Sequence, residues 1–218
     1  MAPTLRTALR DAALIVVSIL IAFSLDAWWD GQSRIAEERE ALAALQAELA
    51  GSRTELDSVM SFNRSQVEQI DQILDHEGTG LRALAGGMTF DPSLGAVEAI
   101  LAGGLDLIVS PDLRAGIAAW PGVLREIEVD QRIMVDRFNE LSDALVTQGL
   151  HIDVSRSIRS DPEAVSDGLL ARVTNDVVIR QRLSALRTGV DGLLYELSDV
   201  EVRLEHLETM VEAALGSL

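Results

Sequence analysis

The sequence predicts an all-α protein in which an N-terminal transmembrane helix continues into an elongated antiparallel helical bundle or coiled coil. Three features indicate this fold class. Aromatic residues make up only 4% of the chain, while Leu, Ala, Ile and Val are plentiful, a mixture that favours helix packing over sheets. Apolar residues recur at helical spacing, and no stretch sustains the alternation of a strand. A charge-free apolar run lies near the N-terminus.

The apolar run Ala12–Leu25 contains no charge, and Asp26 is the only charged residue between Ala12 and Trp28. Extended to Trp29, its length is close to the roughly 20 residues that cross the hydrocarbon core. We therefore expect a transmembrane helix over 11–29.

The flanks of this run predict its orientation in a bacterial inner membrane. Arg6 and Arg10 precede it, so the positive-inside rule places a tail, residues 1–10, in the cytoplasm and the bulk of the chain in the periplasm. Trp28 and Trp29 follow it, where an interfacial aromatic anchor belongs.

A cleaved signal peptide is the competing interpretation. The arginine-bearing start fits it, and Ala22-Phe23-Ser24 offers a candidate cleavage site. Two bulky tryptophans follow at once, however, and helical sequence runs on without an extended break, which favours an uncleaved anchor. Both interpretations predict export of the rest of the chain.

Ser18, Ala22 and Asp26 recur every fourth residue and so share one face of the predicted span. Small and polar residues in such a row permit close approach of helices in lipid. We expect this face to pack on other integral membrane subunits, in a hetero-complex or a homodimer, although Asp26 alone is better explained as a solvated interfacial carboxylate.

The exported part, 30–218, begins with a long helix predicted over 30–77, with a weak point at Gly51-Ser52. Glycines at 78, 80, 86 and 87 then break the pattern. Short helices are expected over 92–119, the first of them opened by Asp91-Pro92 and closed by Gly103-Gly104.

Ser110-Pro111 starts the next helix, which we expect the Trp120-Pro121-Gly122 corner to interrupt. A further helix is predicted over 121–147, followed by an irregular stretch over 148–160. The last helical region is predicted over 162–216, opened by Asp161-Pro162.

The C-terminal region carries the strongest periodicity in the chain, two interleaved heptad series of apolar residues that are typical of knobs-into-holes packing. The first is Ile179, Leu186, Leu193, Val200, Leu207 and Ala214; the second is Leu183, Val190, Leu197, Leu204, Val211 and Leu218. We expect this helix to pack antiparallel to helix 30–77, so that the C-terminus returns toward the membrane. A parallel coiled-coil dimer through the same seam is the alternative.

The residues offer little basis for catalysis or cofactor binding. Cysteine is absent, and His76, His151 and His206 lack metal-ligand spacing. Carboxylates such as Glu37-Glu38 lie between apolar positions and are expected on solvated helix faces. The net charge of −17 argues against nucleic acid as a partner. We expect no cofactor and no enzymatic activity.

Two stretches, Ile19–Trp29 and the segment ILAGGLDLIVSPDLRAGIAAWPGVL that ends at Leu124, resemble a widespread group of small bacterial single-pass inner-membrane proteins with a helical periplasmic domain. That group is uncharacterised. The resemblance implies a membrane location and a helical architecture, and it implies no activity.

Taken together, these features predict a non-catalytic structural or accessory subunit whose span docks on a larger membrane protein complex and whose bundle braces its periplasmic face. The alternative is a periplasmic sensory or ligand-binding bundle coupled to a partner. An enzyme with an unrecognised site is a third possibility, which no motif in the sequence supports.

Overall fold

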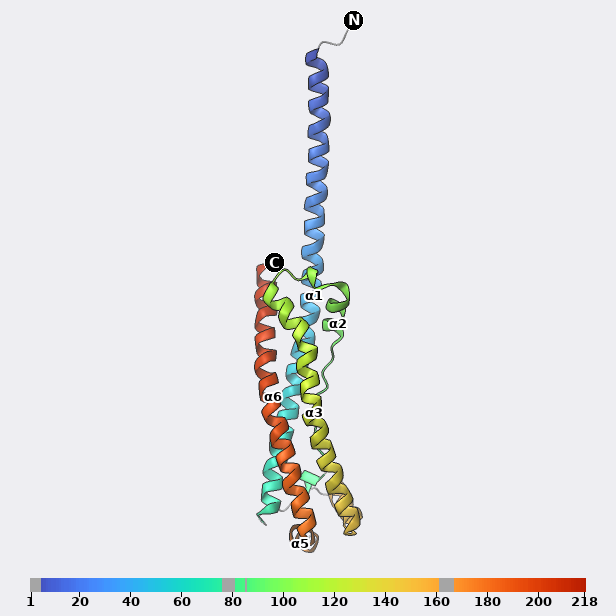
Figure 1. Ribbon diagram of the computed structural model, residues 1–218, viewed down its shortest axis with the longest axis vertical. Coiled ribbons are helices and arrows are strands. Elements are labelled where there is room, and N and C mark those ends of the chain that lie inside the picture. Colours follow the sequence, from blue (N-terminus) through green and yellow to red (C-terminus); the bar gives the residue numbers. More distant parts are fainter. Residues whose placement is uncertain (1–4, 76–80, 85, 161–166) are drawn as a thin grey trace.

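The computed structural model describes residues 5–75, 81–84, 86–160 and 167–218, and it describes side chains from Leu14 onward except at positions 82, 160 and 167. The described residues form helices and contain no strand (Figure 1). In chain order the elements are α1 (Leu5–Leu74), η1 (Arg82–Leu84), α2 (Gly95–Gly103), η2 (Leu105–Leu107), α3 (Pro111–Thr147), α4 (His151–Ser160), α5 (Asp167–Asn175) and α6 (Val177–Ser217).

Helix α1 is a single 70-residue helix that joins the apolar segment to the bundle without a break. Gly31 and Gly51 lie inside it, so the predicted weak point at Gly51-Ser52 does not interrupt the helix. Side chains from Leu14 to Glu37 are exposed, and burial begins at Glu38. The apolar segment therefore projects from the bundle as a free helix (Figure 1).

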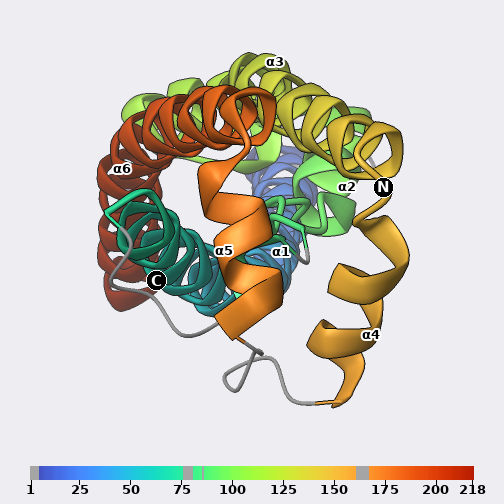
Figure 2. The ribbon, with the colours of Figure 1, turned by 90° about the horizontal axis from the view of Figure 1, so that it is seen from below.

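The bundle is built on α6, which packs along both α1 and α3. Helix α6 runs antiparallel to the other two, and its C-terminus lies beside α1 where the bundle begins (Figures 1 and 2). Every seam residue from Ile179 to Val211 is buried, as knobs-into-holes packing requires. The predicted antiparallel all-α bundle is thus confirmed.

The alternative use of the seam, a parallel dimer with a second copy, is not the arrangement found. Leu193, Leu197 and Leu204 are fully buried within one chain, because α1 and α3 occupy the two sides of α6. The seam is core of the monomer.

A connector, residues 81–84 and 86–110, returns along α1 from the far end of the bundle to the start of α3 (Figure 1). Leu81, Phe90, Val97 and Ile108 bury their side chains along its length. The connector therefore contributes a continuous strip of core.

The sequence predicts that the corner at Trp120-Pro121-Gly122 interrupts a helix, and this prediction is wrong. Helix α3 continues through Pro121. A proline inside a helix removes one backbone hydrogen bond, but Trp120 and Val123 on either side of it are buried. Tertiary packing holds the turn in helical form.

The start predicted for the first short helix is also wrong, since α2 begins at Gly95 rather than at Asp91-Pro92. The N–H of Asp91 donates to Oε1 of Glu55 on α1, at 2.8 Å, and the following residues run along α1. The predicted end of that helix is correct: α2 stops at Gly103, and Gly104 has a φ of 100°, which glycine adopts readily.

The stretch 148–160, predicted to be irregular, contains α4. Val154 of α4 and Leu150, which directly precedes the helix, are buried near the end of α3. Asp153 in the first turn and Arg159 in the last complement the helix dipole. The predicted helix start at Asp161-Pro162 lies outside the described residues.

Candidate functional site

The predicted membrane-packing residues lie together on the projecting part of α1. Ser18, Ala22 and Asp26 are all exposed and occupy one face of a continuous helix. The hydroxyl of Ser18 donates to the carbonyl of Leu14 at 2.8 Å. Its proton is therefore satisfied within the helix, as a hydroxyl in lipid must be.

The predicted interfacial pair also lies on this exposed part of α1. The rings of Trp28 and Trp29 pack edge to face, with centroids 6.3 Å apart and an interplanar angle of 63°. Among the described residues α1 is the one helix long and apolar enough to cross a membrane. The side chains of Arg6 and Arg10, predicted to set the orientation, lie outside the described residues.

Between the tryptophans and the bundle, α1 has a short exposed stalk, residues 30–37. At 1.5 Å per residue it separates the two by about 12 Å. The stalk is helical throughout, so one continuous helix joins the apolar segment to the bundle.

Within the bundle, polar side chains of α1 hold the connector by its backbone. The Nε2 of Gln66 donates to the carbonyls of Ala83 and Gly86, both at 3.0 Å. Asn63 donates to the carbonyl of Met88 at 2.9 Å and accepts from its N–H at 3.3 Å. Both side chains are buried, and the bonds satisfy backbone groups that no sheet or helix pairs.

Nearer the N-terminus of α1, the carboxylate of Glu48 serves as the N-cap of α2. It accepts the N–H groups of Ala96 at 2.7 Å and Val97 at 3.1 Å, where Leu94, the local cap residue, offers no side-chain acceptor. A carboxylate at this position also complements the helix dipole. Helix α2 is thus started by a residue from another helix.

Glu38 also binds the connector backbone from α1, and its position differs from the one that the sequence predicts. The sequence places it on a solvated face, but it is only 4% exposed, and its Oε1 accepts the N–H of Val109 at 2.7 Å. It lies where α1 enters the bundle, next to the start of α3. The carboxylate closes the end of the connector that lies nearest the apolar segment of α1.

Sequence reasoning missed these polar contacts, although a signal for them exists. Asn63 and Gln66 fall within the apolar rows of α1, and Gln131 falls between Ile127 and Met134 on α3. A polar residue at a core position must find a buried partner, and here the partner is the connector backbone.

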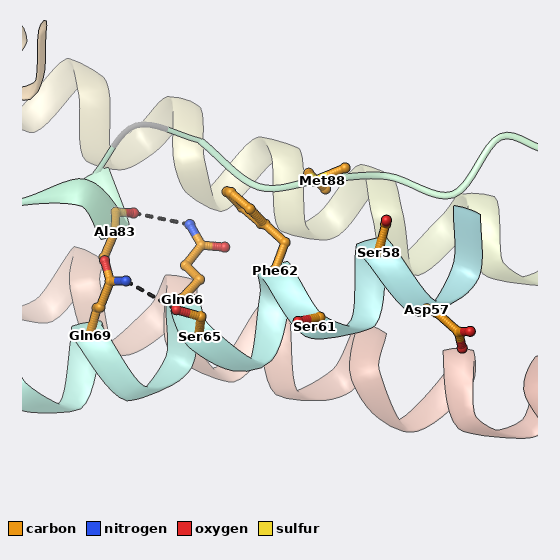
Figure 3. A pocket seen from close by; sticks show the side chains of 9 residues that line it. All are labelled: Asp57, Ser58, Ser61, Phe62, Ser65, Gln66, Gln69, Ala83 and Met88. Atoms are coloured by element: carbon orange, nitrogen blue, oxygen red, sulfur yellow. Dashed lines mark hydrogen bonds between the residues drawn. The ribbon is translucent and has the colours of Figure 1, made fainter. Parts of the chain in front are cut away.

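An open groove of about 570 Å³ lies between α1 and the connector (Figure 3). Hydroxyls of Ser58, Ser61 and Ser65 line it along α1, and Phe62 and Met88 contribute apolar surface. Gln66, Gln69, Asp57 and Ala83 complete the described lining. The groove therefore combines a row of hydroxyls on α1 with apolar surface from both α1 and the connector.

Gln66 leaves an unusual group beside this groove. Its side chain is 2% exposed, and its Oε1 has no hydrogen-bond partner among the described residues. The amide cannot be reversed without loss, because its nitrogen already donates to two carbonyls, which only accept. An unsatisfied buried acceptor is costly and calls for a donor.

Charged groups join the long helices on the surface. Arg53 of α1 donates to Oε2 of Glu208 on α6 through Nε at 3.3 Å and Nη2 at 2.9 Å. Burial alone would lower the pKa of Arg53, but the hydrogen bond and charge of Glu208, together with Glu201 and Asp57, outweigh it and raise the pKa. Arg53 therefore remains a cation at any physiological pH.

A second arginine joins the same two helices nearer the far end. Arg187 of α6 donates to both carboxylate oxygens of Asp71 on α1, with Nη2 to Oδ2 at 3.1 Å. The hydrogen bond that Arg187 donates to Asp71 and the charge of Asp191 raise the pKa of Arg187. Two separated pairs thus favour one register of α1 against α6.

The described residues provide no arrangement suited to metal binding. No group of three or more His, Cys, Asp or Glu side chains among them could hold an ion. His151 lies on α4 and His206 on α6, and His76 falls outside the described residues. The expected lack of a cofactor stays a prediction.

Comparison with known proteins finds no matching family model, no matching curated protein and no matching solved structure.

Proposed function

We propose that this protein is a non-catalytic, single-pass subunit of the bacterial inner membrane that docks on a larger membrane protein complex and stabilises it from the periplasmic face. The observation that carries the proposal is the unbroken helix α1, which joins an exposed apolar segment to a well-packed bundle. A flexible tether would serve equally well for simple retention. A continuous helix instead fixes where the bundle stands relative to the membrane.

The row of Ser18, Ala22 and Asp26 supplies the docking face in this proposal. Small side chains let a partner helix approach closely, and Asp26 offers a carboxylate to a donor near the membrane surface. Bulky residues such as Leu20 and Phe23, which are also exposed, would face lipid. The bilayer and other integral membrane subunits are then the partners.

Blue-native electrophoresis of gently solubilised membranes tests the docking. The wild-type chain should migrate in a complex larger than itself, and Ala22→Leu should release it because the larger side chain separates the helices. Leu20→Ile, on the same turn of the helix, is the matched control and should leave the complex intact. Migration of the wild-type chain only as a free monomer would refute the proposal.

The orientation can be tested separately, because the chain has no native cysteine. A membrane-impermeant maleimide should label Thr54→Cys in spheroplasts, in which the outer membrane has been removed and the inner membrane is intact. Thr7→Cys should react only after lysis. Equal labelling of the two before lysis would contradict a cytoplasmic N-terminus.

A ligand-binding bundle coupled to a partner is the second candidate function. The open groove beside the unsatisfied Oε1 of Gln66 favours it. The two functions are compatible, since the groove lies on the bundle and the docking face on the apolar segment of α1.

A further inference from the structure

The groove between α1 and the connector has the features of a built binding site. Its volume of about 570 Å³ falls within the range of small-molecule sites, about 300–1,000 Å³. It lies against a side chain that is buried and has an unsatisfied acceptor, Oε1 of Gln66. In Figure 3 this oxygen points away from Ala83 and toward the side where Phe62 lies.

The hydroxyls that line the groove differ from others on the same helix. Ser18, Ser24 and Thr54 donate to the carbonyl four residues earlier on α1, the usual arrangement for a helical hydroxyl. No such bond is formed by Ser58 or Ser61 among the described residues, and Ser65 acts as an acceptor, from Nε2 of Gln69 at 3.1 Å. The groove thus presents hydroxyl protons that are not used within the helix.

The charge of the lining restricts the ligand. The nine described lining residues include no arginine or histidine and one carboxylate, Asp57. That carboxylate also acts on Arg53, whose pKa it helps to raise. An anionic ligand would meet no cation here, and a polycation would meet a single carboxylate, so a neutral ligand fits best.

The remaining surface is apolar. Phe62 is half-buried and Met88 is exposed, and in Figure 3 the Phe62 side chain points from α1 toward the connector, on which Met88 lies. A ligand must therefore combine many hydroxyl donors and acceptors with an apolar face that can lie against an aromatic ring. Sugars have this combination, since their hydroxyl edges are polar and their C–H faces are not.

We propose that the groove between Ser58–Gln69 of α1 and Met88 of the connector binds a neutral saccharide. A sugar hydroxyl would donate to Oε1 of Gln66 after a side-chain movement that uncovers this buried atom. The serine hydroxyls would bond to neighbouring sugar oxygens, and the pyranose face would lie against Phe62. This proposal does not depend on docking within the membrane, because the groove is formed by the bundle of one chain.

The test uses the full chain in lipid nanodiscs with methionine methyl groups labelled with ¹³C, titrated with two neutral trisaccharides, cellotriose and N-acetylated chitotriose. Met88 lines the groove, whereas Met210 lies toward the other end of the bundle on α6 and serves as an internal reference. We expect a saturable shift of the Met88 methyl signal with at least one of the two trisaccharides, and no shift of Met210.

Variants assign that shift to the groove. Ser58→Ala with Ser61→Ala should weaken the saccharide affinity at least about tenfold, because two hydrogen bonds are lost. Phe62→Leu should weaken it while keeping an apolar side chain in place. The matched control is Thr54→Ala, one turn earlier, whose hydroxyl bonds to its own helix and whose loss should leave the affinity unchanged.

Three results would overturn the proposal. One is the absence of any Met88 shift with either trisaccharide at millimolar concentration. Another is saccharide binding that the double serine variant leaves unaltered. The third is a Met88 shift produced by a neutral tripeptide amide but by neither sugar, which would assign the groove to peptides.

Discussion

The side-chain amide of Gln131 on α3 forms two hydrogen bonds with the backbone of Phe90 in the connector. Its Oε1 accepts the Phe90 N–H and its Nε2 donates to the Phe90 carbonyl, each at 2.9 Å. Both residues are buried. One side chain thus satisfies, from the α3 side, backbone groups that Asn63 and Gln66 satisfy nearby from the α1 side, and the connector is held between the two helices.

Replacement of Gln131 should therefore be costly. Gln131→Leu keeps the approximate volume but leaves a buried N–H and a buried carbonyl without partners, and we expect the free energy of unfolding to fall by about 2–4 kcal/mol. Chemical denaturation followed by circular dichroism measures the change. Gln181→Leu, at an exposed position of α6, should change it by less than about 0.5 kcal/mol, and equal effects of the two would contradict this account.

Two glycines should respond in opposite directions to substitution by alanine. A Cβ at Gly87 would lie 2.4 Å from Sδ of Met134, so Gly87→Ala should lower the free energy of unfolding by about 1–3 kcal/mol. A Cβ at Gly51 would meet nothing within 4 Å, so Gly51→Ala should raise it by about 0.5–1 kcal/mol. Thermal unfolding of the two variants side by side gives both signs. Destabilisation by Gly51→Ala would indicate that α1 needs a flexible point there.

The ion pair of Arg53 and Glu208 should contribute to the free energy of unfolding. Titration of Arg53 should not change this contribution over the ordinary pH range. The pKa of Arg53 is raised in the folded protein, so its contribution is present below the unfolded value and is lost only as pH rises through the folded one, which is strongly alkaline. Arg53→Gln should cost about 1 kcal/mol, since both side chains are partly exposed. The cost should be the same at about pH 7 and about pH 10.

Arg64→Gln is the control for that measurement. Arg64 is exposed on the same helix and has no ion pair among the described residues, so its replacement should have little effect. A cost for Arg53→Gln that disappears by about pH 10 would show that the arginine has lost its proton there, against the raised pKa.

The continuity of α1 predicts a narrow distance between spin labels placed across the stalk. Ser24→Cys and Thr54→Cys, labelled in a chain without native cysteine, should lie about 45 Å apart at 1.5 Å per residue. Double electron–electron resonance in nanodiscs measures the distribution. A control pair at Glu40 and Glu68, both within the bundle and exposed, should have the same width, and a broader distribution across the stalk would reveal a hinge near Gly31.

The sequence predicts the long helices well because apolar residues recur along them at a regular spacing. Each of the two heptad series of α6 contributes five buried residues between Ile179 and Val211. Such a pattern is satisfied by burial against other helices. A local rule failed at Pro121, because proline's effect on a helix is a local energy that burial of Trp120 outweighs.

The connector and the groove could not be predicted in the same way. The connector has no periodicity over 86–94, and its path is set by bonds from Gln66, Asn63 and Glu48 on a distant part of the chain. A glutamate on a helix surface is ordinarily solvated, and nothing local marks Glu48 as a cap for another helix. Polar residues within apolar rows indicate that each has a buried hydrogen-bond partner, but they do not indicate which segment of the chain provides it.

The length of the continuous helix α1 determines how far its distal end would move when its apolar segment tilts. From Trp29 to the end of α1 at Leu74, the helix extends about 68 Å at 1.5 Å per residue. Transmembrane helices tilt by about 20° on average, and a change of that size at the membrane would swing the far end sideways by roughly 20 Å. In the proposed membrane orientation, a small tilt at the tryptophan pair would become a large displacement of the distal helices α4 and α5.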